Sequence, residues 1–160
     1  MNIFVLDKYP ASAVRMLCDC HVRKMSVETA QILSGVMIRR GLPLRDGMPK
    51  PQNINHPVIV AATNGGAANW VLNYYFELLD EYKYRFGREH RYERFKFNYK
   101  QKLWAMPLEA KHHWLCKCCG NLDVSDLDIV VAYRMYYAEV KKPQLIAKDL
   151  WKFTNREDWT

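Results

Sequence analysis

The sequence predicts a mostly α-helical protein: a compact bundle of three main helices with long loops and an irregular C-terminal tail. Apolar residues recur at helical spacing over long stretches of the chain. Glycine and proline gather between these stretches, which marks the loops. The chain has 160 residues, the size of one domain with a core of its own. We therefore expect residues 1–160 to form a single domain.

The first helix is expected over about residues 10–38. Pro10 suits the first turn of a helix, and the next glycine or proline is Gly35. Successive residues turn by about 100° around a helix, which separates an apolar side from a polar side. The side expected to face the core carries Val14, Leu17, Met25 and Ile32. The side expected to face water carries Arg15, Asp19, Arg23 and Ser26.

A polar stripe makes this helix the candidate catalytic element. The stripe consists of His21, Lys24, Glu28 and Gln31, which fall within an arc of roughly 80° that overlaps the apolar side. Burying such groups is costly unless they pair with each other or line a cleft. One explanation is a buried hydrogen-bond network that satisfies itself. The other is an active-site wall in which Glu28 is the acid, base or electrostatic stabiliser and Lys24 and His21 tune it or hold a phosphate.

The second helical region is expected over residues 57–86. A loop rich in glycine and proline precedes it, over residues 39–56. The region can pause at Gly65-Gly66, and Gly87 is a natural C-cap.

The third helix is expected over about residues 124–142. Asp123 or Ser125 can cap its N-terminus, because their side-chain oxygens accept hydrogen bonds from the first backbone N–H groups. Pro143 is expected to end it, since proline lacks an N–H group. The residues beyond form the irregular tail.

The charge of the chain favours a polyanionic partner. Lys and Arg number 24 against 17 Asp and Glu, which gives a net charge of +7. Nucleic acid is therefore the expected partner. The chain has no apolar run long enough to span a membrane, and no signal peptide opens it. We expect a cytoplasmic protein without a membrane partner; the oligomeric state is left open.

The segment 83–104 is the stretch that most resembles a nucleic-acid-binding surface, because cations alternate with aromatic rings. Its candidate phosphate contacts are Arg85, Arg88, Arg91, Arg94 and Lys96. Cations bind phosphates, and rings stack on bases. An amphipathic segment with an aromatic core and a basic surface has the same pattern, so both interpretations stay open.

Five cysteines and no secretory signal favour reduced thiols or metal ligands over disulfides. Cys116, Cys118 and Cys119 follow two histidines, and the gap between Cys116 and Cys119 suits zinc. The pair Cys18 and Cys20 lies in the first expected helix, where positions i and i+2 diverge. Zinc at Cys116, Cys118 and Cys119 is the one cofactor that these patterns allow; ordinary thiols are the alternative, and no other cofactor is expected.

A scattered pattern spans most of the chain. It comprises Cys18-Asp19-x-His21-Val22-x-Lys24-Met25-x-x-Glu28-x-x-Gln31, His56-Pro57, Asn69-Trp70, Glu81-Tyr82-x-x-Arg85-x-Gly87 and Tyr133-Arg134-x-Tyr136-Tyr137. This pattern resembles small phage proteins. Through them it resembles the bacteriophage pyrimidine-dimer DNA glycosylase family, also called endonuclease V.

The resemblance implies roles for particular residues. The family carries a His and a catalytic Glu seven residues apart on its first long helix, which match His21 and Glu28. The family's nucleophile is the α-amine exposed when the initiator methionine is removed, so Met1 and Asn2 are candidate site residues. Lys24 and Gln31 lie near Glu28 on the same helix and are candidates too. The family's C-terminal aromatic and basic segment holds DNA. The matching residues are Tyr133, Arg134, Tyr136 and Tyr137, and Trp151 and Lys152 of the tail.

The chain also departs from the family pattern. Asn2 is large for the residue after Met1, which argues against removal of Met1. Ile3 replaces the basic residue after the nucleophile, and Val27 and Gln31 replace basic residues beside the Glu. These departures argue against the strand-cleaving lyase step. They leave a DNA-binding enzyme that acts on an extruded base, most simply an N-glycosylase.

Two alternatives stay open: a phage transferase that modifies DNA bases on the same scaffold, and a non-catalytic DNA-binding accessory protein stabilised by zinc. If the protein is phage-encoded, the cytoplasm is that of the host.

Overall fold

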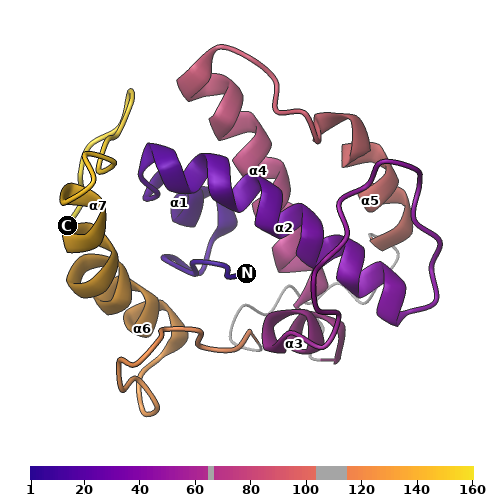
Figure 1. The fold of residues 1–160 in the computed structure, drawn as a ribbon, viewed down its shortest axis with the longest axis horizontal. Helices are drawn as coiled ribbons and strands as arrows, with labels where there is room; N and C mark the ends of the chain where they lie inside the picture. Colours follow the sequence, from indigo (N-terminus) through magenta and orange to yellow (C-terminus); the bar gives the residue numbers. More distant parts are fainter. Residues whose placement is uncertain (65–66, 104–114) are drawn as a thin grey trace.

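The computed structural model describes residues 1–64, 67–103 and 115–160, and it confirms a mostly helical fold (Figure 1). The elements in chain order are α1 (Pro10–Arg15), α2 (Asp19–Arg39), α3 (Pro57–Asn64), α4 (Ala68–Phe86), the 3-10 helix η1 (Glu93–Phe95), α5 (Lys96–Leu103), α6 (Ile129–Met135), the π-helix η3 (Tyr136–Lys141) and α7 (Lys142–Ile146). No helix in these three ranges is long and apolar enough to cross a membrane. The single-domain organisation stays a prediction.

The helices α2 and α4 form the centre of the fold. They cross and pack against each other, while α1 contacts α4 and α3 contacts α2 (Figure 1). The core between them is rich in aromatic rings. Its largest fully buried side chains include Trp70, Tyr74, Tyr75 and Tyr99.

The N-terminal segment, residues 1–9, lies between α2 and the C-terminal helices (Figure 1). The ring of Phe4 lies 4.7 Å from that of His21 and 5.2 Å from that of Tyr137, measured between centroids. Arg134 of α6 donates a 2.7 Å hydrogen bond to a backbone carbonyl of the segment. The first residues of the chain are therefore part of the core rather than a fraying end.

The single helix expected over residues 10–38 is wrong, because α1 and α2 are separated by a break. Cys18 has an extended backbone, with φ −70° and ψ 162°. Tertiary contacts replace the helical hydrogen bonds there: the Tyr137 hydroxyl accepts from the Cys18 N–H at 2.9 Å, and Arg85 donates to the Leu17 carbonyl at 2.7 Å. These partners lie far along the chain, so local sequence does not reveal the break.

Two residues expected to face water are instead buried. Asp19 accepts hydrogen bonds from Arg85 and from the backbone and hydroxyl of Thr154. Ser26 donates to the Val22 carbonyl at 2.8 Å, which satisfies its hydroxyl within α2. Lys24, which the stripe places toward the core, has a side chain that is 55% exposed.

A buried ionic network joins α4, the start of α2 and the C-terminal tail. The Arg85 guanidinium is fully buried and lies 2.7 Å from Glu81 and 3.0 Å from Asp19. Arg156 of the tail binds both carboxylate oxygens of Glu81 at 2.9 Å. Burial raises the pKa of Glu81, but the hydrogen bonds and charges of the two arginines outweigh it, so the net shift is downward. The network locks α4 to the α1–α2 break and to the tail.

The C-terminal helical run differs from the predicted third helix at both ends. It begins at Ile129, where the Asp128 side chain caps the helix by accepting from the Val130 N–H at 2.8 Å. It continues past Pro143, which lies in the first turn of α7, where a missing N–H is tolerated. The predicted C-cap of α4 is confirmed, since Gly87 has a φ of +65°, in the left-handed region that glycine adopts readily.

We predict that Arg85→Ala lowers the free energy of unfolding by about 3–5 kcal/mol, because it leaves Glu81 and Asp19 buried without their partner. Urea denaturation followed by circular dichroism measures the change. Arg88→Ala is the matched control, because Arg88 is exposed and its loss is expected to change stability by less than about 0.5 kcal/mol. Equal effects of the two substitutions would contradict the role of the network.

Candidate active site

The candidate site is built where the N-terminal segment meets α2. The backbone N–H of Asn2 donates to Oε2 of Glu28 at 2.8 Å. Glu28 lies in the third turn of α2, and its side chain is 15% exposed. The carboxylate therefore keeps access to solvent while contacting the start of the chain.

The side chain of Asn2 is fixed from two sides. Its Oδ1 accepts from the hydroxyl of Tyr133 in α6 at 3.0 Å, and its Nδ2 donates to the Cys118 carbonyl at 2.9 Å. The Tyr133 hydroxyl in turn accepts from the Cys118 N–H. Because α6 and the segment before it clamp Asn2, the backbone nitrogen is held against Glu28.

Lys24 pairs with Glu28 one helical turn away, at 3.5 Å. Because the Lys24 side chain is 55% exposed, the pair contributes at most about 1 kcal/mol to stability. The pair places a cation beside the carboxylate at the surface, where it can also meet an anionic group of a ligand.

His56 is a site residue that pattern reasoning did not single out. Burial lowers the pKa of His56, the nearby α-amine of Met1 lowers it further, and Glu28 opposes this shift. The imidazole is therefore neutral at pH 7, the form that can accept a proton. A lone histidine in a loop has no periodicity that would mark it as a site residue. The sequence indicated His56 only through the His56-Pro57 pair of the family pattern.

Two members of the polar stripe point elsewhere. The His21 ring bonds to the Tyr137 hydroxyl through Nδ1, at 2.8 Å, near the start of α2. Gln31 donates to the Lys50 carbonyl at 3.3 Å, which attaches the following loop to α2. The structure thus brings Asn2, Lys24 and Glu28 together, and the charges of Glu28 and of the Met1 amine both act on His56.

The predicted phosphate contacts Arg88, Arg91 and Arg94 are exposed. Lys96 is half-buried and pairs with Asp80 at 3.1 Å. Arg94, Lys96 and exposed Phe97 are among the residues that line a surface hollow of about 380 Å³. Cations and a ring beside a hollow suit a nucleotide chain. Trp104, at the end of the predicted basic-aromatic segment, lies outside the described residues.

Several other candidates are not surface residues. Arg85 has no exposed side-chain area, so its interpretation as a surface cation is corrected by the buried network. Tyr133 and Tyr137 are fully buried and Tyr136 is 7% exposed, because their rings form the core under the C-terminal run. Burial prevents these tyrosines from stacking on bases in this conformation.

The remaining C-terminal candidates do reach the surface. Arg134 is 44% exposed and pairs with Asp7 at 3.1 Å. Lys152 is exposed, and Trp151 is partly exposed, with its indole N–H bonded to Asp158 at 2.8 Å. The tail and the stretch from η1 to α5 lie on opposite sides of α4 (Figure 1).

The thiols of Cys116 and Cys118 lie 3.2 Å apart, whereas the Cys119 thiol points to the Ala132 carbonyl at 3.8 Å. The hydrogen bond from Cys116 is the main cause that lowers the pKa of Cys118 to about 7; burial opposes it, and the Met1 amine assists. The candidate zinc ligands before Cys116, His112 and His113, lie outside the described residues. Zinc at the three cysteines stays a prediction.

The expectation for Cys18 and Cys20 is wrong. The break before α2 turns the two side chains together, and their sulfur atoms lie 3.4 Å apart. Within the described ranges, Cys18, Cys20 and His21 are the group of three residues placed to share a metal ion.

This arrangement places a carboxylate of α2 beside the first residues of a small, mostly helical protein. The model of the pyrimidine dimer DNA glycosylase family matches residues 1–94, more than half of the chain, and this range contains Asn2, Glu28 and His56. The chain therefore belongs to the pyrimidine dimer DNA glycosylase family, which confirms the resemblance and supports a DNA glycosylase-like function in general. No curated protein and no solved structure matches the chain.

We predict that replacing Arg88, Arg91 and Arg94 by Ala weakens binding to all DNA sequences alike. Each lost phosphate contact should reduce the slope of log affinity against log salt by about 0.9, because fewer counterions are released. Filter binding at several salt concentrations measures the slope.

The matched control replaces Lys8, Arg15 and Lys148, three exposed cations elsewhere on the protein, and is expected to retain most of the slope. An equal loss in both triple variants would show that net charge, rather than this segment, carries the affinity.

Proposed function

We propose that the protein is a DNA N-glycosylase that acts on a nucleotide extruded from the duplex, with Glu28 as the catalytic carboxylate. The observation that carries the proposal is the 2.8 Å hydrogen bond between Oε2 of Glu28 and the Asn2 nitrogen, within the range that the family model matches. The glycosidic bond is inaccessible inside the stacked duplex, so the nucleotide must leave the stack.

Glu28 supplies the negative charge that this reaction needs. Positive charge develops on the sugar as the glycosidic bond breaks, and a fixed carboxylate at the sugar stabilises that charge. The same carboxylate can take a proton from the attacking group. His56, which is neutral and lies within the electrostatic influence of Glu28, is the second candidate for proton transfer, and Lys24 can hold a phosphate beside Glu28.

The state of the N-terminus decides whether strand cleavage follows base release. With Met1 in place, the Asn2 nitrogen is an amide, which is not a nucleophile. If Met1 is removed, the same nitrogen becomes an α-amine beside a carboxylate, the pairing that activates amine nucleophiles. We therefore assign base release to the protein with Met1 and expect the imine-forming lyase step only where an α-amine reaches the sugar.

The test of the function is mass spectrometry of nucleosides after incubation with intact, ultraviolet-irradiated and base-modified DNA. Free base and abasic sites support the glycosylase. An altered base would assign the protein to the base-modifying transferases, and unchanged DNA in every case would leave a DNA-binding accessory protein.

We predict that Glu28→Gln reduces base release by a factor on the order of 10²–10⁴ while DNA affinity and melting temperature change little. The substitution keeps the volume and an oxygen for the Asn2 N–H but removes the charge. Glu89→Gln is the control, because Glu89 is an exposed carboxylate outside the site, 64% exposed, and its loss should leave turnover unchanged. Full activity of Glu28→Gln would exclude Glu28 as the catalytic carboxylate.

We also predict that borohydride traps no covalent adduct through the Asn2 nitrogen in protein that retains Met1. Asn2→Ser, which places a small residue after Met1 and favours its removal, is expected to yield a trapped adduct on the new α-amine. Intact mass reports the N-terminus, and peptide mapping of the adduct identifies the nitrogen. An adduct on Met1 itself would instead identify the amine of Met1 as the nucleophile.

A further inference from the structure

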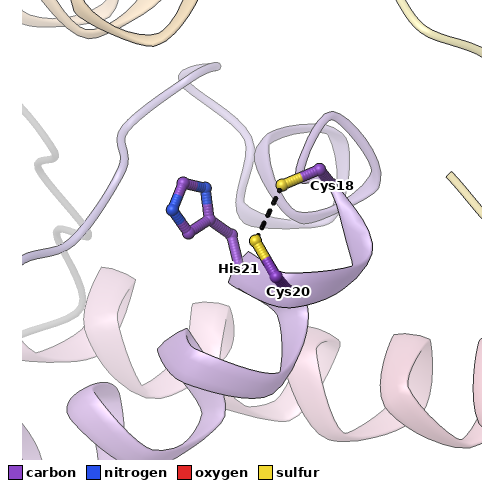
Figure 2. Close-up of side chains that lie close together, drawn as sticks. All are labelled: Cys18, Cys20 and His21. Atoms are coloured by element: carbon purple, nitrogen blue, oxygen red, sulfur yellow. Dashed lines mark hydrogen bonds between the residues drawn. The ribbon is translucent and has the colours of Figure 1, made fainter. Parts of the chain in front are cut away.

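Cys18, Cys20 and His21 come together at the break between α1 and α2, away from the proposed catalytic residues. Figure 2 shows the two thiols and the imidazole turned toward one another. The sulfur atoms lie 3.4 Å apart, and the three donor atoms all lie within 4.8 Å of one another. Glu28 follows His21 by seven positions, which correspond to about 10 Å along the α2 axis, so this group is separate from the Glu28 carboxylate.

One hydroxyl shows how the donors converge. The oxygen of Tyr137 lies 2.8 Å from Nδ1 of His21 and 3.3 Å from Sγ of Cys18. A single atom within hydrogen-bonding distance of both groups shows that Nδ1 and the sulfur lie close together, and an ion that binds Nδ1 replaces the hydroxyl as the partner of His21. Cys20 completes the ring of donors from the first turn of α2.

The donor types are those of zinc. Two cysteine sulfurs and one imidazole nitrogen form a mixed sulfur and nitrogen set, and zinc binds such sets with tetrahedral geometry. Cys18 and His21 are buried, whereas Cys20 is partly exposed and gives an ion a route inward. A thiolate is the form that binds a metal.

We propose that Cys18, Cys20 and His21 bind one zinc ion, which clips the start of α2 to the C-terminal helices. Both thiols give up their protons on binding, so two thiolates balance the charge of Zn²⁺. A water molecule that enters beside Cys20 takes the fourth place. Tyr137 is a positioning residue: its hydroxyl donates to the Cys18 sulfur and orients it, as outer partners of metal ligands do.

The clip has a structural consequence. Tyr137 belongs to η3, and its ring also lies 5.4 Å from the ring of Trp151 and 6.0 Å from that of Trp159 in the tail. An ion on Cys18 therefore sits at the junction of α2, the C-terminal run and the tail. Binding that requires the folded arrangement stabilises it by mass action.

The proposal is tested on the full chain purified without a histidine tag. Elemental analysis is expected to find one zinc per protein, and chelation should remove it and lower the melting temperature. Refilling with Co²⁺ should give thiolate-to-cobalt charge-transfer absorption and the intense visible bands of a tetrahedral ion.

Variants locate the ion. Cys18→Ser, Cys20→Ser and His21→Gln are each expected to lose stoichiometric zinc, and Tyr137→Phe should weaken binding by roughly 10–100-fold without abolishing it. The matched control is Cys116→Ser combined with Cys118→Ser, which removes the other close thiol pair and should keep the ion. Loss of the ion in the control alone would move the site to that pair and overturn the proposal.

A second measurement serves if a ligand variant fails to fold. In the unaltered protein, alkylation of Cys20 followed by peptide mass spectrometry should be slow with Zn²⁺ and fast after chelation. Equal labelling in the two states, or a Cys18–Cys20 disulfide in protein purified under reducing conditions, would overturn the proposal.

Discussion

The structure depends on the buried guanidinium of Arg85. A charge with no exposed area is tolerated only with its partners in place, and those partners come from the end of α1, the start of α2 and α4. Glu81 extends the network to Arg156 in the tail. Because the network fixes the α1–α2 break, it fixes the orientation of Cys18 and the start of the helix that carries Glu28. The ionic network thus positions the helix that carries both the Glu28 site and the proposed zinc site.

The second constraint is the burial of the N-terminal segment. Chain ends usually fray, but here the residues from Ile3 to Leu6 are at most 1% exposed. The Phe4 ring packs between α2 and the C-terminal helices. Asn2, which precedes them, is held by Tyr133 and by the Cys118 backbone. A backbone nitrogen near the start of the chain is therefore held in a fixed position beside Glu28.

The aromatic rings and the positive charges occupy different parts of the fold. Tyr133 and Tyr137 use their hydroxyls for internal hydrogen bonds and their rings for the core. Arg88 and Arg91, in contrast, stay exposed at the surface. This division leaves the positive charge on the outside, where electrostatic attraction does not depend on base sequence.

The sequence by itself determined what depends on neighbours along the chain: the helical class, the loop over residues 39–56, the C-cap at Gly87 and the spacing that puts Lys24 beside Glu28. Helical periodicity and glycine conformation are local properties, so they can be read from short windows. Only the tertiary structure decided the break at Cys18, the burial of Arg85 and the approach of Asn2 to Glu28. Each of these depends on a partner many residues away, and a buried charge or a hydrogen bond to a remote carbonyl overrides local preference because leaving it unsatisfied costs more than breaking a helix.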